Sequence, residues 1–204
     1  MLYHLLYPLR DFIFSFNIFR YITFRAAMAA LTAFILSLIF GPLLINKLKA
    51  LKVGEKINKA DSSKLDDLHR HKQSTPTMGG ILILGAVIIS TLLWADLSTR
   101  CIWIVLFSTT WLGITGFMDD YFKQIKKKAS GLTPAVKLTS QIVLGLILGI
   151  ILIMYSRDVL LEIPFLKGVN LDLDGLYVLF VILVIAGSSN AVNLTDGLDG
   201  LAIG

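Results

Sequence analysis

The sequence predicts an all-α fold, a polytopic bundle of membrane-spanning helices that forms one integral membrane unit over residues 1–204. Hydrophobic side chains make up 55% of the chain and charged ones only 16%, whereas soluble domains contain about 25% charged residues. A helix that crosses the hydrocarbon core needs about 20 mostly apolar residues. Five apolar runs approach that length, at residues 26–45, 78–95, 101–118, 138–155 and 176–190.

The segments between these runs predict two smaller elements. Before the first run, Phe12, Phe16 and Phe19 recur at near-helical spacing, which indicates an amphipathic interfacial helix over residues 1–20. Residues 159–174 alternate between apolar and polar side chains. Such alternation is typical of a β-hairpin, so we expect a small hairpin there, on the outer side of the membrane.

Positive charges are distributed unevenly among the loops. Residues 46–76 hold eight Lys or Arg and residues 119–137 hold five, whereas the loops between them hold far fewer. Because loops rich in Lys and Arg stay on the cytoplasmic side of a membrane, we expect both segments and the end of the chain in the cytoplasm. For most of these charges, topology and attraction to anionic membrane lipids are the favoured explanation, ahead of a role in binding phosphate.

Two adjacent carboxylates, Asp119 and Asp120, end the run at 101–118. Ionised carboxylates at membrane depth are costly and are rarely tolerated without a function. They also oppose the dipole at a helix C-terminus. Carboxylates suit Mg²⁺, and one of them can accept a proton from an attacking phosphate. The pair therefore predicts a metal-dependent catalytic site for phosphate chemistry. The alternative is a hydrated pair at a helix end, offset by Lys123.

A second polar cluster follows the last apolar run. Asn190, Asn193, Asp196 and Asp199 are spaced by three residues, so neighbouring pairs would share a helix face. Such a set can bind a sugar or a base and can contact a metal, which makes Asn193 a candidate metal ligand beside Asp120. Polar packing between helices is the alternative interpretation.

A third group precedes the run at 78–95. Lys72 offers a cation, and Thr77 offers a hydroxyl just after Pro76. Together they could bind an anionic or nucleotide ligand. Taken alone, a topological charge with a helix cap explains this group better.

Three motifs together resemble those of the bacterial phospho-N-acetylmuramoyl-pentapeptide transferases, within the polyprenyl-phosphate N-acetylhexosamine-1-phosphate transferase superfamily. Each motif is modest alone, but their order, spacing and position at inner span ends make the resemblance specific, and it covers essentially the whole chain. The motifs are Lys72-Gln-Ser-Thr-Pro-Thr-Met-Gly-Gly80, Gly116-Phe-Met-Asp-Asp-Tyr121 and Asn190-Ala-Val-Asn-Leu-Thr-Asp-Gly-Leu-Asp-Gly-Leu-Ala202.

The resemblance implies a Mg²⁺-dependent enzyme of peptidoglycan synthesis in the bacterial inner membrane, with its active site on the cytoplasmic face. The donor would be UDP-N-acetylmuramoyl-pentapeptide and the acceptor undecaprenyl phosphate, giving lipid I and UMP. No nucleic-acid partner is expected, and a homodimer is compatible with the resemblance.

The resemblance also implies roles for residues near the reacting phosphates. Asp119 matches the acid/base that acts on the lipid phosphate, and Asp120 matches a residue that supports the metal–phosphate site. Lys123 and Lys137 match cytoplasmic lysines near the diphosphate.

For the nucleotide end of the donor, the implied roles fall on the other two motifs. Lys72 and Asp199 match positions that contact the uracil. Thr77, Asn193 and Asp196 match positions nearer the ribose and phosphates.

The sequence departs from the family pattern in three ways. Ser74 stands where a Gly usually precedes Thr-Pro-Thr, and Ser188-Ser189 replaces a Thr-Gly-like pair. In addition, the family has about ten spans, with a later metal-binding Asp and a His-rich loop that do not occur in residues 1–204. We therefore expect an N-terminal portion of a longer transferase domain, inactive alone.

Three alternatives remain open from the sequence. A related polyprenyl-phosphate sugar-1-phosphate transferase would use the same groups. A CDP-alcohol phosphatidyltransferase would explain residues 196–202. However, the Ala-Arg pair expected of that family is missing from this sequence, and Asp119 and Asp120 would have no role. A non-catalytic binding or transport subunit would place polar residues at mid-span, yet the acids cluster at span ends.

Overall fold

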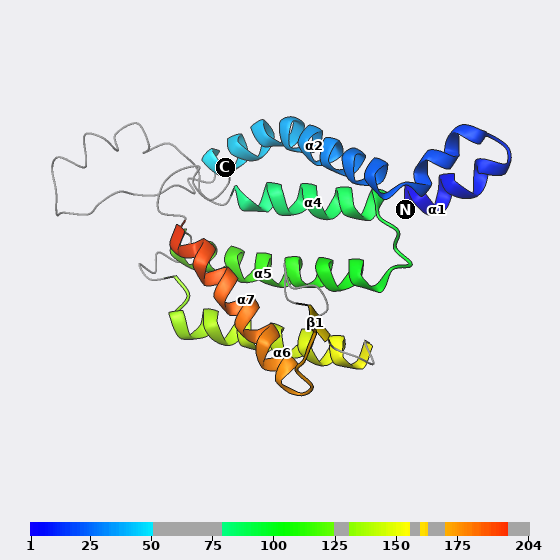
Figure 1. Ribbon diagram of the computed structural model, residues 1–204. Coiled ribbons are helices and arrows are strands. Elements are labelled where there is room, and N and C mark those ends of the chain that lie inside the picture. Colours follow the sequence, from blue (N-terminus) through cyan, green and yellow to red (C-terminus); the bar gives the residue numbers. More distant parts are fainter. Residues whose placement is uncertain (51–78, 125–130, 156–159, 163–169, 196–204) are drawn as a thin grey trace. The chain divides into compact units, whose positions relative to one another are not determined.

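Helices dominate the computed structural model, which describes residues 1–50, 79–124, 131–155, 160–162 and 170–195 (Figure 1). The chain divides into two compact units, Met1–Leu132 and Thr133–Gly204, and each is described by itself. The strands of the described ranges pair in one small sheet. The all-α class expected from composition is confirmed.

The first unit contains three long helices in the part of it that the structure describes. Helix α4 lies between α2 and α5 and packs against both (Figure 1). The contact between α4 and α5 is close at Gly113 of α5, because Leu84 of α4 occupies the space that a side chain at this position would fill. The α-helices described in this unit are α1 (Leu2–Leu6), α2 (Ile22–Ala50), α4 (Gly80–Trp94) and α5 (Arg100–Gln124).

The N-terminal segment is not the single interfacial helix that the spacing of its aromatic residues predicted. Helix α1 is followed by two 3₁₀ helices, Tyr7–Asp11 and Phe14–Arg20. The expectation was wrong because Pro8 sits at the start of the first 3₁₀ helix and lacks the N–H that an α-helix interior needs. Ile13 then adopts an extended conformation (φ −132°, ψ 106°) that separates the two 3₁₀ helices.

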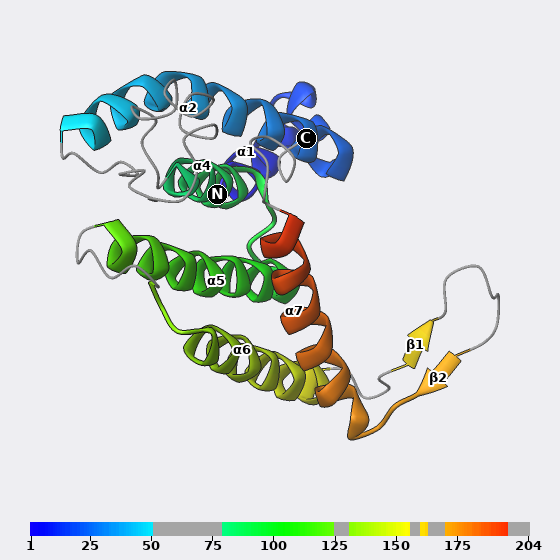
Figure 2. The same cartoon turned by 90° about the vertical axis from the view of Figure 1, so that its left-hand side faces the viewer.

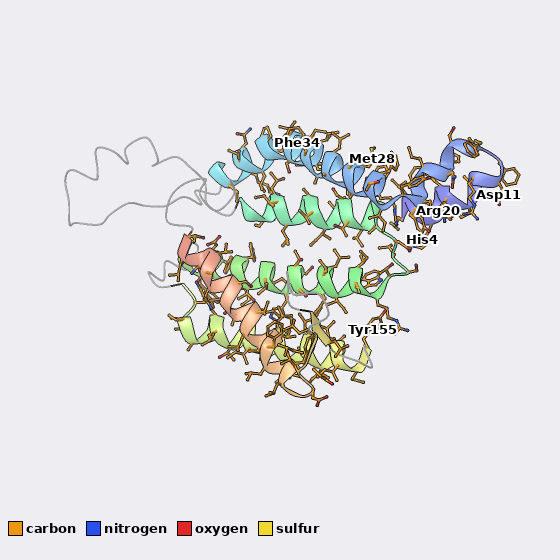
Figure 3. The ribbon with its side chains drawn as sticks, viewed as in Figure 1. His4, Asp11, Arg20, Met28, Phe34 and Tyr155 are labelled. Carbon is orange, nitrogen blue, oxygen red and sulfur yellow. The ribbon has the colours of Figure 1, made fainter. Side chains whose placement is uncertain are left out.

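Polar and aromatic contacts hold this segment against the end of α4. His4, labelled in Figure 3, has its Nε2 3.3 Å from Asp96 Oδ1. The ring of Phe19 stacks on that of Trp94. Burial by itself raises the pKa of Asp96, but hydrogen bonds from Ser98 and the charges of His4 and Arg25 outweigh it and hold the pKa below its ordinary value. Asp96 is therefore negatively charged at neutral pH and can attract the positive charges of Arg25 and of protonated His4.

Four helices of the described chain are long and apolar enough to cross a membrane, one fewer than expected. The run at 78–95 forms α4, which has 15 residues and extends about 22 Å at 1.5 Å per residue. Its C-terminal end is set by Ala95, whose extended conformation (φ −71°, ψ 156°) ends the helix. The four candidate spans are Ile22–Leu48, Arg100–Lys123, Pro134–Tyr155 and Leu176–Thr195.

Within its described residues, the second unit contains two packed helices, α6 (Pro134–Tyr155) and α7 (Leu176–Thr195), with a hairpin between them. Strands β1 (Leu160–Glu162) and β2 (Asn170–Asp172) pair antiparallel, with Leu161 opposite Leu171, and β2 leads into α7 (Figure 2). The hairpin expected within 159–174 is confirmed.

Helices α6 and α7 extend beyond the apolar runs expected at 138–155 and 176–190, because helix formation continues through polar residues at the ends of these runs.

Two glycines allow α6 and α7 to approach closely. A Cβ at Gly145 would lie 2.7 Å from the Cα of Ile182, and one at Gly149 would lie 2.9 Å from the Cα of Val178. Leu144, beside the first glycine, is fully buried. Small residues at such interfaces let backbones approach and increase van der Waals packing, which is a main source of helix association in membranes.

Candidate functional site

The best-defined polar site of the first unit surrounds Asp119, one turn before the end of α5. Its side chain is buried, with 7% of the residue's surface exposed. Asp119 Oδ2 lies 2.8 Å from Lys123 Nζ, one helical turn later. Asp119 Oδ1 accepts a hydrogen bond of 2.9 Å from the backbone N–H of Leu132. The structure therefore brings together Asp119 and Lys123, two of the residues singled out in the sequence.

Asp120 differs from Asp119 in its surroundings. It is half-buried and projects from α5 about 100° around the helix axis from its neighbour, as successive helical residues do. The two carboxylates therefore have different environments, which suits two different roles. An arrangement in which both bind one ion through the same face of α5 is not favoured.

Among the described residues, Asp120 has the chemistry that best suits the magnesium ion implied by the family resemblance. No group of three or more His, Cys, Asp or Glu side chains gathers within the described ranges. Mg²⁺ usually takes only one or two protein carboxylates and retains several waters, so the half-buried carboxylate of Asp120 fits as one ligand. Asp119, paired with Lys123, is the less suitable donor of the two.

In the second unit, Asn190 of α7 is oriented by a side chain that sequence reasoning missed. Gln141 of α6 is buried and accepts a 2.9 Å hydrogen bond from Asn190 Nδ2. Gln141 Nε2 in turn donates to Ser189 Oγ at 3.0 Å. The signal that could have found it is an amide side chain within the apolar run at 138–155. Asn193, one turn after Asn190, is exposed.

Replacing Gln141 by Leu is expected to destabilise the protein by about 1 kcal/mol, because two interhelical hydrogen bonds are lost and such bonds average somewhat under 1 kcal/mol in membranes. The measurement is the free energy of unfolding in an SDS titration of micellar protein. Thr139→Val, at an exposed position of the same helix, is the matched control. Equal stability of the two variants would show that the Gln141 bonds contribute nothing.

The other predicted site residues divide between the second unit and the part of the chain outside the described ranges. Lys137 lies half-buried in the first turn of α6. It belongs to the second unit together with Asn190 and Asn193. Four residues fall outside the described ranges, so their placement stays a prediction: Lys72, Thr77, Asp196 and Asp199.

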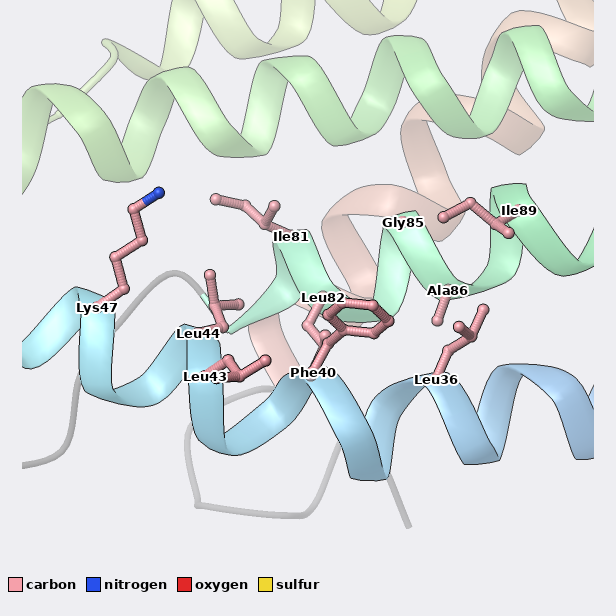
Figure 4. A pocket seen from close by; sticks show the side chains of 10 residues that line it. All are labelled: Leu36, Phe40, Leu43, Leu44, Lys47, Ile81, Leu82, Gly85, Ala86 and Ile89. Carbon is pink, nitrogen blue, oxygen red and sulfur yellow. The ribbon is translucent and has the colours of Figure 1, made fainter.

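An apolar groove between α2 and α4 contains none of the predicted site residues (Figure 4). Its volume is about 360 Å³, and Leu36, Phe40, Leu82 and Ile89 are among the side chains that line it. Lys47 at one end is the charged residue of its lining. With so few polar groups the groove cannot orient a nucleotide or a phosphate, so the polar cluster around Asp119 remains the candidate active site.

Comparison with known proteins gives matches to two family models. The model of the family "Glycosyl transferase family 4" matches residues 102–204. A second model, the phospho-N-acetylmuramoyl-pentapeptide-transferase signature 1, matches residues 72–84. The two matches include the three motifs quoted above, including Asp119 and Asp120.

Curated proteins named phospho-N-acetylmuramoyl-pentapeptide-transferase are similar over the full chain. The protein of Desulfatibacillum aliphaticivorans is 50% identical over 205 aligned residues, which cover 100% of this chain and 56% of the relative. Those of Pelobacter propionicus and Desulforapulum autotrophicum are each 48% identical with the same coverage. The chain thus spans a little more than half the length of the curated relatives it matches.

Proposed function

Because the chain belongs to glycosyl transferase family 4, we propose that it forms part of a membrane enzyme that transfers phospho-N-acetylmuramoyl-pentapeptide from its UDP-linked donor to undecaprenyl phosphate. The products are lipid I and UMP. One observation carries the proposal: a buried carboxylate, Asp119, held by Lys123 at the end of a span, within a chain that is about half identical to transferases of that name. The reaction is phosphoryl transfer, in which positioning and charge neutralisation dominate catalysis.

In this proposal Asp119 accepts the proton of the acceptor phosphate, so that a phosphate oxygen can attack the donor's sugar-linked phosphorus. UMP leaves with the electrons of the broken P–O bond. Lys123, whose side chain is 43% exposed, can neutralise phosphate charge as well as pair with Asp119. Mg²⁺ held by Asp120 and Asn193 would neutralise further phosphate charge when bound, since carboxylate and carbonyl oxygens are ligands that suit it.

The remaining candidate residues are assigned to the donor. Lys137 would neutralise the diphosphate, and Asn190, already oriented by Gln141, would hydrogen-bond the nucleotide-sugar. Four residues outside the described ranges complete this set. Lys72 and Asp199 are assigned to the uracil, and Thr77 and Asp196 are assigned to the ribose and phosphates.

The function is tested in a chimera in which the remainder of the Desulfatibacillum aliphaticivorans relative continues this chain after Gly204. Purified in lipid with Mg²⁺, the chimera should transfer the phospho-sugar from UDP-N-acetylmuramoyl-pentapeptide to undecaprenyl phosphate and release UMP. Chelation of Mg²⁺ should abolish transfer, and its return should restore it. Residues 1–204 alone should not transfer, because the electrostatic cage of a phosphoryl transferase must be complete to stabilise the transition state.

The alternatives give distinct outcomes in the same assay. Transfer from UDP-N-acetylglucosamine in preference to the pentapeptide donor would indicate another sugar-1-phosphate transferase of the superfamily. Release of CMP from a CDP-alcohol would indicate a phosphatidyltransferase. Binding without any transfer would favour a non-catalytic subunit and would overturn the proposed reaction.

The proposed site lies on the cytoplasmic face, which predicts the accessibility of the lysine-rich segment after α5. A cysteine introduced as Lys127→Cys, with Cys101 replaced by Ser, should be protected from an impermeant thiol reagent in intact cells and should react after permeabilisation. The positive charges of this segment favour the cytoplasmic side of the membrane. Labelling of intact cells at this position would reverse the topology and move the site to the outer face.

A further inference from the structure

A backbone turn after α5 brings two features to Asp119 that neither the motifs nor the comparisons assign. Gly131 adopts a left-handed conformation, with φ +60°. The next residue, Leu132, directs its N–H to Asp119 Oδ1 at 2.9 Å. Residues with a side chain rarely adopt this conformation, whereas glycine does so readily. The turn therefore depends on a glycine at this position to direct a backbone donor at the carboxylate.

Space at Gly131 is restricted by the same carboxylate. A Cβ built at Gly131 would lie 2.5 Å from Asp119 Oδ1 and 2.8 Å from Cγ and Cε of Lys123. These distances are too short for real contacts, so any side chain at position 131 must displace Asp119, Lys123 or the turn itself. Gly131 is thus packed against both members of the ion pair.

Two donors approach the carboxylate of Asp119 from different directions. Lys123, on the same helix, approaches Oδ2 at 2.8 Å, and Leu132, 13 residues later in the chain, approaches Oδ1. An ammonium and an amide N–H both complement a negatively charged carboxylate. Because one donor is fixed to the backbone, it restrains the orientation of the carboxylate more firmly than a flexible lysine side chain can.

We infer that Gly131 and the N–H of Leu132 position the carboxylate of Asp119 for proton transfer, which makes them positioning elements of the active site. The inference rests on the proposed function of Asp119. A proton acceptor must lie within hydrogen-bond reach of the group it deprotonates, and a misplacement of about 1 Å can lower a rate by about 10²-fold. A Cβ only 2.5 Å from Asp119 Oδ1 would require Asp119 to move by a distance approaching that size if the carboxylate is the group that yields.

The first test is Gly131→Ala in the full-length chimera. Its kcat should fall by about 10²-fold, while KM for the UDP-linked donor changes little and the protein remains folded. Gly85→Ala is the matched control, because a Cβ at Gly85 meets nothing within 4 Å, and its kcat should stay near that of the parent. A loss of donor affinity and thermal stability in proportion to kcat would indicate a purely structural role and overturn the inference.

A second substitution separates crowding from backbone strain. Asn tolerates the left-handed conformation far better than Ala, but it carries the same Cβ. If contact with Asp119 decides the effect, Gly131→Asn should lose as much kcat as Gly131→Ala. Restoration of normal kcat by Asn would mean that strain alone was responsible, which contradicts positioning through contact with Asp119.

Combination with Asp119→Asn tests whether Gly131 acts through Asp119. Residues that act as a unit are strongly non-additive. Once Asp119→Asn has removed the proton acceptor, adding Gly131→Ala should lower kcat no further. If the two effects multiply, Gly131 acts on something else. If Asp119→Asn by itself leaves kcat unchanged, both the proposed role of Asp119 and the positioning inference fail.

Hydrogen exchange at the Leu132 amide gives a readout that does not depend on transfer activity. The amide should be protected in the parent protein and lose protection in both Asp119→Ala and Gly131→Ala, whereas Gly85→Ala should leave it protected. Protection in a chimera that shows no transfer would mean that the proposed function fails while the contact is real. An unprotected Leu132 amide in an active parent would overturn the inference and leave the proposed function standing.

Discussion

Replacing Asp119 by Asn in the full-length chimera is expected to lower turnover by about 10²–10⁴-fold, the contribution of a positioned acid or base. Asn preserves the size of the side chain and can still accept the hydrogen bond that Leu132 donates to Asp119. It removes the negative charge and the ability to take a proton at neutral pH. The variant therefore changes the chemistry of residue 119 with little change in its packing.

The measurement is kcat for lipid I formation together with the dissociation constant of the UDP-linked donor. The donor constant should change far less than kcat, because Asp119 is assigned to the acceptor phosphate. Asp120→Asn is the informative comparison, since loss of the Asp120 carboxylate should raise the Mg²⁺ concentration needed for half-maximal rate. Turnover of Asp119→Asn within a few-fold of the parent would exclude Asp119 as the base.

Replacing Gly145 by Ala is expected to destabilise the protein by about 1–3 kcal/mol, the usual cost of overpacking. The added methyl group would lie 2.7 Å from the Cα of Ile182, and a backbone atom cannot move aside as a flexible side chain can. Helices α6 and α7 must therefore separate locally and lose packing around the buried Leu144. The same substitution at Gly149, facing Val178, should have a comparable effect.

Gly187→Ala on α7 is the matched control, because a Cβ at Gly187 meets nothing within 4 Å. Alanine is the better helix former by up to about 1 kcal/mol, so the control should be neutral or slightly stabilising. The free energy of unfolding in an SDS titration should thus change in opposite directions for the two positions. A stabilising Gly145→Ala would show that α6 and α7 do not approach as closely as the structure describes.

Much of the fold could be predicted from composition and hydropathy. The apolar runs at 26–45, 101–118, 138–155 and 176–190 lie within candidate spans of the structure, because helices are the only way for a single segment to satisfy its backbone in lipid. The run at 78–95 was the exception in length, since hydropathy does not show where a helix ends. The break at Ile13 was also missed, because aromatic spacing carries no information about backbone conformation at the residues between.

For the candidate site, the sequence by itself determined which types of chemical group are available. The pair Asp119 and Asp120 at a span end, and the family motifs that contain them, follow from the order of residues and are supported by the family match over 102–204. Four residues expected to bind the UDP-linked donor lie outside the described ranges, so their roles remain predictions from the motifs alone.

Only the tertiary structure decided which groups meet. That Leu132 donates to Asp119, that Gln141 orients Asn190 and that Gly145 admits the backbone of α7 could not be predicted from the sequence. The physical reason is that hydropathy and helical periodicity depend on neighbouring residues, whereas each of these contacts joins residues more than ten positions apart. Such contacts depend on how turns and helix packing direct the chain, and they determine the orientation of the chemical groups that the sequence supplies.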